Sequence, residues 1–321
     1  MLRLVVVCLV GALIWMGWWV FGHTAYQRGL QAWVEDRRGE GWAADYSDLS
    51  TRGFPNRFDT TITDVALADP ETGVAWSAPF VQFLSLAYKP HQVIAVLPDT
   101  HVFSTPFQTI DITHEDARAS LFLQASAQLG LDSARIVAMD LKATSSRGPQ
   151  LTLDEGRLAA EALEDQDNTY RIGAELVGLF PTKEALRALD PGGVLPERIE
   201  RLRADVVMQF TATWDRTAIE TARPQLTNID LSDLSARWGN VTFRAAGALS
   251  VDDQGIPEGR ITIRAEEWRR ILDMAEAVGM VPGPLRGTIE AALRLLAGNG
   301  DVLDAPLGII PLGDAPRLVI R

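Results

Sequence analysis

The stretch that decides the fold is RLRADVVMQFTATW, residues 201–214. Apolar and polar side chains alternate along it, and successive side chains of a β-strand point to opposite faces of a sheet. The pattern predicts one long, half-buried strand over residues 201–214. The apolar side chains that we take as the candidate functional face are Leu202, Val206, Met208, Phe210 and Trp214.

The same alternation occurs on both sides of this stretch. Residues 170–176, 241–245 and 261–265 show it clearly, and residues 83–89 and 226–236 show it more weakly. Most of these strands follow one another with a turn between them and no helix. Such an order favours an antiparallel sheet, because parallel strands need long crossover connections.

Apolar residues at helical spacing interrupt the strands in three places. They predict helices at residues 182–189, 266–278 and 283–297, and a short connection joins the last two into a helical hairpin. We therefore expect a mainly β fold of the α+β class. It has an N-terminal transmembrane helix, then a large, curved, mostly antiparallel sheet with the C-terminal helix pair packed on it. The most linker-like stretch, residues 190–196, is where two halves of the body would meet.

Residues 1–27 have the composition of a membrane anchor. No charged residue occurs from Leu4 to Gln27. At about 1.5 Å per residue, the apolar centre at residues 4–22 is long enough to cross the roughly 30 Å hydrocarbon core of a bilayer. Tryptophans gather near its C-terminal end, where aromatic rings settle at the headgroup level. The segment predicts a single transmembrane helix that tethers residues 28–321 to a membrane.

A cleaved signal peptide is the alternative interpretation of this segment. Its apolar stretch is longer than the core of an ordinary signal peptide, and residues 20–25 offer no small-residue cleavage site. An uncleaved anchor is therefore favoured. The positive charges on the two flanks are too evenly divided to fix the orientation.

The composition excludes several classes of protein. The net charge is −12, whereas a nucleic-acid-binding surface needs clustered Lys and Arg in excess. The single cysteine, Cys8, excludes intrachain disulfides and a zinc site built on paired cysteines. With 47% apolar residues the chain is also too apolar to be disordered.

The sequence nominates no catalytic or cofactor site. It lacks the GxSxG, GxxxxGK[ST] and GxGxxG patterns that mark hydrolase elbows and phosphate-binding loops. Three of the histidines, His91, His101 and His114, lie close in sequence, but their spacing matches no metal-binding motif and we expect them at the surface. We therefore expect no catalytic residue, no metal ligand and no cofactor.

One segment is locally specific, GWAADYSDLSTRGFPNRFD at residues 41–59. With its G-W pair and R-G-F-P-x-R turn, the chain resembles the uncharacterised proteobacterial family called domain of unknown function 2125, and the stretch at residues 247–259 agrees with that family's C-terminal signature. The signature turn consists of Arg52, Gly53, Phe54, Pro55 and Arg57. We expect it to be structural, with Arg52 and Arg57 paired to nearby acidic residues; a partner-binding patch is the alternative.

This resemblance implies a bacterial inner-membrane anchor with the body in the periplasm, which supplies the orientation that the charges leave open. It implies no catalytic residue. More distantly, the C-terminal order of hairpin, two helices and strand is similar to AsmA-like envelope proteins, whose curved sheets are associated with lipids.

Two functions remain open at this stage. One is a membrane-tethered sheet that binds an apolar ligand such as a lipid, or serves envelope homeostasis. The other is a scaffold or assembly factor that binds another envelope protein. An enzyme is the least favoured class. The bilayer is the expected partner of residues 4–22, and no nucleic acid is expected.

We predict that the anchor stays attached and that the body is exported. Alkaline phosphatase fused after Arg321 should be active, because that enzyme needs an oxidising compartment to form its disulfides. The intact mass of the purified protein should include residues 1–22. A mature chain that begins near His23 would contradict the prediction.

Overall fold

The computed structural model describes residues 1–298, 300–312 and 315–320, with the side chains of residues 219, 220 and 310–320 left aside. The chain forms two compact units. The first consists of residues 1–125 and 143–148, and the second of residues 126–142 and 149–321. Each unit is described by itself.

The first unit contains the long N-terminal helix and an antiparallel sheet. The helix is α1 (Leu2–Gly39). The strands are β1 (Ala43–Asp45), β2 (Asp48–Arg52), β3 (Arg57–Asp69), β4 (Val74–Leu86), β5 (Lys89–Val96), β6 (Thr100–Ser104), β7 (Thr109–Thr113) and β8 (Asp116–Leu123), with the last residues of β9 (Leu131–Ser145). Strand β3 pairs with both β2 and β4 and is therefore internal to this sheet.

Helix α1 is an integral part of the first unit, not a free tail. Its residue Gly22 is buried against the ring of Phe58 on β3, so closely that a Cβ atom added at Gly22 would lie 2.2 Å from the Phe58 ring. One turn further on, the Tyr26 hydroxyl donates a hydrogen bond of 2.6 Å to the Pro90 carbonyl. Leu30 then packs against the buried cluster around Ile62. The C-terminal half of α1 thus covers the sheet.

The same helix is the candidate membrane span. Among the described residues it is the one helix long and apolar enough to cross a bilayer, by length and composition. A signal sequence at the N-terminus has the same properties. The side chains of residues 1–14 are exposed, and Trp15 makes the first hydrogen bond from α1 to the rest of the unit.

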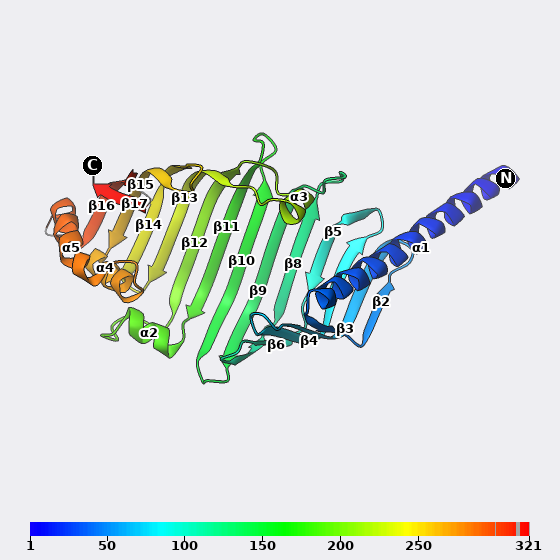
Figure 1. Cartoon of the computed structure of the whole chain (residues 1–321), viewed down its shortest axis with the longest axis horizontal. Coiled ribbons are helices and arrows are strands. Elements are labelled where there is room, and N and C mark those ends of the chain that lie inside the picture. The colour runs from blue at the N-terminus through cyan, green and yellow to red at the C-terminus, as the bar shows by residue number, and fades with distance from the viewer. Residues whose placement is uncertain (299, 313–314, 321) are drawn as a thin grey trace. The chain divides into compact units, whose positions relative to one another are not determined.

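The second unit is built around a broad antiparallel sheet. Its strands are the rest of β9, β10 (Gln150–Ala162), β11 (Thr169–Phe180), β12 (Ile199–Phe210), β13 (Leu226–Trp238), β14 (Val241–Val251), β15 (Pro257–Glu266), β16 (Val302–Leu312) and β17 (Ala315–Ile320). Its helices are α2 (Lys183–Leu189), α3 (Arg216–Glu220), α4 (Trp268–Ala277) and α5 (Gly283–Ala297). Consecutive strands pair antiparallel from β10 to β17. Helices α4 and α5 gather at the C-terminal end of this unit, and no described helix of the unit lies across the middle of β10–β12 (Figure 1).

This architecture confirms the predicted fold class, with an apolar N-terminal helix, a large antiparallel sheet and C-terminal helices. The strand predicted at residues 201–214 is too long, because β12 ends at Phe210. Beyond it, the Asp215 side chain accepts hydrogen bonds from the Thr217 and Ala218 amides and starts α3. The strand predicted at residues 83–89 is also wrong, since a turn at residues 87 and 88 divides β4 from β5.

The expected meeting point of two halves does not coincide with the boundary between the compact units. Residues 190–196 lie inside the second unit, where the buried Asp190 side chain accepts a 2.7 Å hydrogen bond from the Leu195 amide. The stretch forms an internal loop between α2 and β12.

We predict that Gly22→Val weakens the first unit. The valine side chain cannot enter the space that the Phe58 ring fills, and overpacking of this kind costs about 1–3 kcal/mol. Gly29→Val is the matched control, because Gly29 lies on the same helix with nothing within 4 Å of an added Cβ. Thermal unfolding of the full chain in detergent should show a lower midpoint for Gly22→Val alone. Equal midpoints for the two variants would mean that α1 does not dock in this way.

Candidate functional site

The central feature of the second unit is an apolar sheet face. In an antiparallel pair, residues opposite each other point to the same face. Leu202 on β12 is opposite Leu176 on β11 and Ala236 on β13, and Ala204 is opposite Ala174 and Leu234. Ala236 is in turn opposite Phe243 on β14. We call these seven residues of β11–β14 the apolar face: Ala174, Leu176, Leu202, Ala204, Leu234, Ala236 and Phe243.

The structure places the predicted face residues along β12 as the alternation requires. Val206 is buried, with 7% of its surface exposed, whereas Leu202, Met208 and Phe210 are half-buried. Met208 is opposite Tyr170 on β11, so it continues the apolar face toward the far end of the strand. The predicted members on β12 thus share one face.

Trp214 joins this face although it lies beyond the strand. Its ring makes an edge contact with Phe210, with the ring centres 5.6 Å apart, and Phe210 makes another with Tyr170 at 6.0 Å. The Trp214 amide donates a 3.0 Å hydrogen bond to the Tyr170 hydroxyl. Burial raises the pKa of Tyr170, so this hydroxyl stays neutral at physiological pH. An aromatic cluster therefore closes one end of the face.

Helices close the opposite end. Leu202 packs beside the buried residues Ile199 and Trp238, and Leu186 of α2 and Met274 of α4 pack on the same cluster. Further along the sheet, Trp268 and Leu272 of α4 are buried against strands β15 and β16. The prediction of a C-terminal helix pair packed on the sheet is confirmed, but the pair covers the C-terminal strands.

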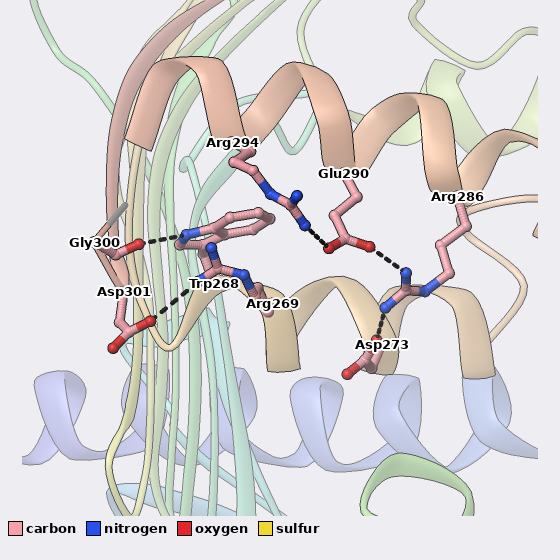
Figure 2. A network of polar contacts seen from close by, with 8 residues as sticks. All are labelled: Trp268, Arg269, Asp273, Arg286, Glu290, Arg294, Gly300 and Asp301. Carbon is pink, nitrogen blue, oxygen red and sulfur yellow. Dashed lines mark hydrogen bonds and ion pairs between the residues drawn. The ribbon is translucent and has the colours of Figure 1, made fainter. Parts of the chain in front are cut away.

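A polar network locks α4 and α5 together (Figure 2). Arg286 of α5 makes ion pairs with Asp273 and Glu276 of α4 and with Glu290 of its own helix. Arg294 donates a 2.8 Å hydrogen bond to Glu290, and the Trp268 indole donates one of 3.2 Å to the Gly300 carbonyl. These contacts hold α4 and α5 together as one helical hairpin at this end of the face.

Between the two closed ends the apolar face is open. A hollow of about 310 Å³ lies over β11–β14 and is lined by the residues of the apolar face together with Glu175, Arg203 and Ser235. Leu234 is 40% exposed there, and Leu158 on the adjoining β10 is 45% exposed. These two leucines flank the alanines Ala174 and Ala204 across the strands, and a contiguous exposed apolar patch is a candidate interaction surface.

Sequence reasoning missed Leu234 because β13 does not alternate regularly. The register of β13 shifts between Leu231 and Leu234 relative to β14, so one extra residue is inserted there. Both leucines therefore point to the apolar face although they are three positions apart. The run of Leu226, Ile229, Leu231 and Leu234 was the available signal.

The opposite face of the same sheet is charged. Asp205 is 8% exposed and accepts a 2.8 Å hydrogen bond from Arg171. Bonding to Arg171 lowers the pKa of Asp205, so the carboxylate stays ionised at physiological pH. Arg201 is paired with Glu175 in the same way. The two faces thus differ sharply in polarity, and the apolar one carries the candidate site.

The signature turn lies in the first unit, at the tip of the β2–β3 hairpin. Gly53 has a φ of 105°, and an added Cβ would lie 2.8 Å from the Arg57 Cβ, so glycine is required there. Arg57 has the expected acidic partner, Asp59, at 3.0 Å. Arg52 is exposed and has no ion pair with any described residue, which differs from the prediction. Phe54 and Pro55 are exposed at the tip.

The surface prediction is wrong for two of the three histidines, because His101 and His114 are buried. His101 and His114 are 9% and 6% exposed, with their ring centres 5.4 Å apart. Neither ring nitrogen of His114 has a hydrogen-bond partner among the described residues, and neither does the Nδ1 atom of His101. His91 is half-buried on β5. Within the described residues there is no group of three or more His, Cys, Asp or Glu side chains placed to hold a metal ion.

A protein-family model matches most of the chain. The model of a family described as "Uncharacterized protein conserved in bacteria (DUF2125)" matches residues 19–311. The chain belongs to the DUF2125 family. The match includes both signature segments, residues 41–57 and 247–259, and therefore confirms the resemblance that they suggested. No curated protein and no solved structure matches the chain, so the more distant likeness to AsmA-like proteins stays a prediction.

We predict that the first unit loses stability in mild acid because of His101. Burial lowers the pKa of His101 below its usual value near 6.5, the charge of His114 lowers it further, and a hydrogen bond to the Pro98 carbonyl opposes both. The unfolded chain therefore binds the proton more readily. The stabilising contribution is fully present above about pH 6.5 and is lost as the pH falls toward the lower folded-state pKa.

Thermal unfolding of the first unit, followed from about pH 8 to pH 5, measures this effect. His101→Gln should flatten the decline of the midpoint, whereas His91→Gln should leave it as in the native protein. A decline that is the same in all three proteins would rule out His101 as its source.

Proposed function

We propose that this DUF2125 protein binds an apolar chain, such as the acyl chain of a lipid, on the open part of the apolar face. In this proposal α1 is an uncleaved anchor in the bacterial inner membrane, the body lies in the periplasm, and the role is non-catalytic. The observation that carries the proposal is the hollow of about 310 Å³ over β11–β14.

The size and lining of the hollow suit a single chain. Ligand pockets of roughly 300–1,000 Å³ lined mainly by apolar side chains are typical of small-molecule sites. The apolar run on β12 from Leu202 to Phe210 is about 26 Å long at 3.3 Å per residue. One leaflet of a bilayer has about half of the roughly 30 Å hydrocarbon thickness, so an acyl chain of that length fits along the strand.

Burial of the apolar face supplies the driving force. Each buried CH₂ group contributes about 0.8 kcal/mol, and binding removes apolar surface of both the ligand and the protein from water. The net charge of −12 opposes docking onto anionic headgroups, so binding depends on apolar surface instead of charge. A tether also raises the effective concentration of membrane lipid, so weak binding is sufficient.

The packing of α1 supports an uncleaved anchor. A cleavage near residue 22 would remove Gly22 from Phe58 and the Trp18 indole from the Ala87 carbonyl, to which it donates a 2.8 Å hydrogen bond. These contacts belong to the first unit. Cleavage would therefore uncover the part of the sheet that α1 covers, which favours an anchor that stays attached.

Lipid binding is tested with one substitution made on each face. Ala174→Glu places a carboxylate in the hollow, whereas Ala246→Glu places the same side chain on the exposed, charged face of β14. Full-length protein is purified in detergent, and bound phospholipid is measured by mass spectrometry. The native protein and Ala246→Glu should retain phospholipid and bind a fluorescent fatty acid, and Ala174→Glu should lose most of both.

Three proteins that all lack lipid would contradict the proposal. The scaffold function would then be preferred, with the same face covered by a segment of another envelope protein. Equal lipid content in both variants would mean that lipid binds elsewhere on the chain.

A further inference from the structure

The part of α1 that precedes its first hydrogen bond to the body is too short to cross a bilayer alone. Residues Leu2–Ile14 are exposed, and Trp15 makes the first hydrogen bond to the rest of the unit, at the β2–β3 turn. Thirteen helical residues extend about 20 Å at 1.5 Å per residue, whereas the hydrocarbon core is roughly 30 Å thick. A full span therefore needs about seven more residues, to Phe21, and three of these residues, Trp15, Trp18 and Trp19, already bond to the body.

Two hairpin tips contact α1 within those seven residues. The first is the β2–β3 turn at residues 53–56, and the second is the β4–β5 turn at residues 87 and 88. The Trp15 indole donates a 2.7 Å hydrogen bond to the Pro55 carbonyl at the first tip. The Trp18 indole donates one of 2.8 Å to the Ala87 carbonyl at the second. The helix that would span the membrane and the two tips thus lie at the same level.

The backbone carbonyls at the two tips are hydrogen-bonded to protein groups, as they must be inside a bilayer. Backbone polar groups within a bilayer must find partners in the protein, because no water is available. The carbonyls of Pro55 and Ala87 are bonded to indoles, and the Arg57 carbonyl accepts a 2.9 Å hydrogen bond from Trp19. The Ala87 amide donates one of 2.9 Å to the Asn56 carbonyl, which joins the two tips.

The side chains at the tips suit a membrane interface. Phe54 is 53% exposed and Tyr88 is 57% exposed, one on each tip. Phe54 makes an edge contact with Trp19, with ring centres 5.4 Å apart. Arg57 and Lys89, which follow the tips, are exposed as well. Aromatic rings at the headgroup level, flanked by basic residues, are the usual composition at this depth.

We propose that the two hairpin tips, residues 53–56 and 87–88, enter the bilayer surface beside α1, so that the anchor is a composite of one helix and two tips. The partner is the lipid leaflet that faces the body. This inference rests on the uncleaved anchor of the proposed function, and it is independent of the apolar face of the second unit. It gives the exposed Phe54 of the signature turn a role as a membrane contact.

The test measures the depth of single nitroxide labels in the full-length protein. Cysteines are introduced by Phe54→Cys, Tyr88→Cys and Asn56→Cys in a Cys8→Ser background. The control is Phe107→Cys, since Phe107 is 73% exposed on the β6–β7 turn. Its neighbour Pro106 lies against Gly73, at the other end of β3 from the tips. Strand β3 separates the two ends by about 40 Å at 3.3 Å per residue.

The labelled proteins are placed in vesicles of phosphatidylethanolamine and phosphatidylglycerol. Power saturation then compares collisions with oxygen, which concentrates in the bilayer, and with a water-soluble nickel chelate. The ratio of oxygen to nickel accessibility should be several-fold higher at positions 54, 56 and 88 than at position 107. The Asn56→Cys label retains both aromatic rings and so tests depth even if the other two variants fold poorly.

Two results would overturn the inference, and they are distinguishable. An intact chain with equal ratios at all four positions would leave the helical anchor in place and remove the tips from the membrane. A chain that lacks the residues before His23, found by intact mass, would remove the anchor and the composite together.

Discussion

The apolar side of the second unit's sheet extends over more strands than its helices cover, and this mismatch leaves part of the apolar face exposed. The cause is the two-residue period of a strand, which forces all alternate residues of β11–β14 onto one face once the register is fixed. A slip by one residue would place Arg203 and Asp205 on the apolar side. Helices α4 and α5 relieve the mismatch only over the C-terminal strands, where Trp268 and Leu272 are buried.

The first unit solves a different problem with the same kind of sheet. There one helix, α1, supplies the cover, and a glycine at position 22 allows the Phe58 ring to reach its backbone. The same helix carries the apolar segment that is long enough to cross a bilayer, and its side chains are exposed up to Ile14. One continuous element thus joins the candidate span to the core of the unit, and the orientation of the unit relative to a membrane follows from the axis of α1.

The sequence predicts the elements of this protein better than their exact limits. Regular alternation located β11 and β12, and helical spacing located α2, α4 and α5 to within a few residues. Two local features made the strand limits hard to predict. The extra residue in β13 interrupts its alternation, so that a central strand looked weak. The Asp215 cap starts α3 just after Trp214, so the chain leaves the sheet before that residue. The strands β1, β2, β6, β7 and β16 were not predicted at all.

The candidate face was predictable on one strand but not as a surface. Alternation names Leu202 and Val206, while the neighbours that complete the hollow, Ala174 and Leu234, are set by cross-strand register. The contacts of α1 with the rest of the first unit could not be predicted from the sequence either. A tryptophan near the end of an apolar segment indicates a membrane interface, but nothing local shows that Trp15 and Trp18 bond to carbonyls at residues 55 and 87. The close approach of Gly22 and Phe58 has no local signal either. For a protein made from its N-terminus, these contacts also impose an order of events: α1 is synthesised before the carbonyls that receive its indoles exist. The indole N–H groups must therefore bond to other partners, such as water, before the first unit folds, and folding exchanges those partners for the carbonyls of Pro55 and Ala87.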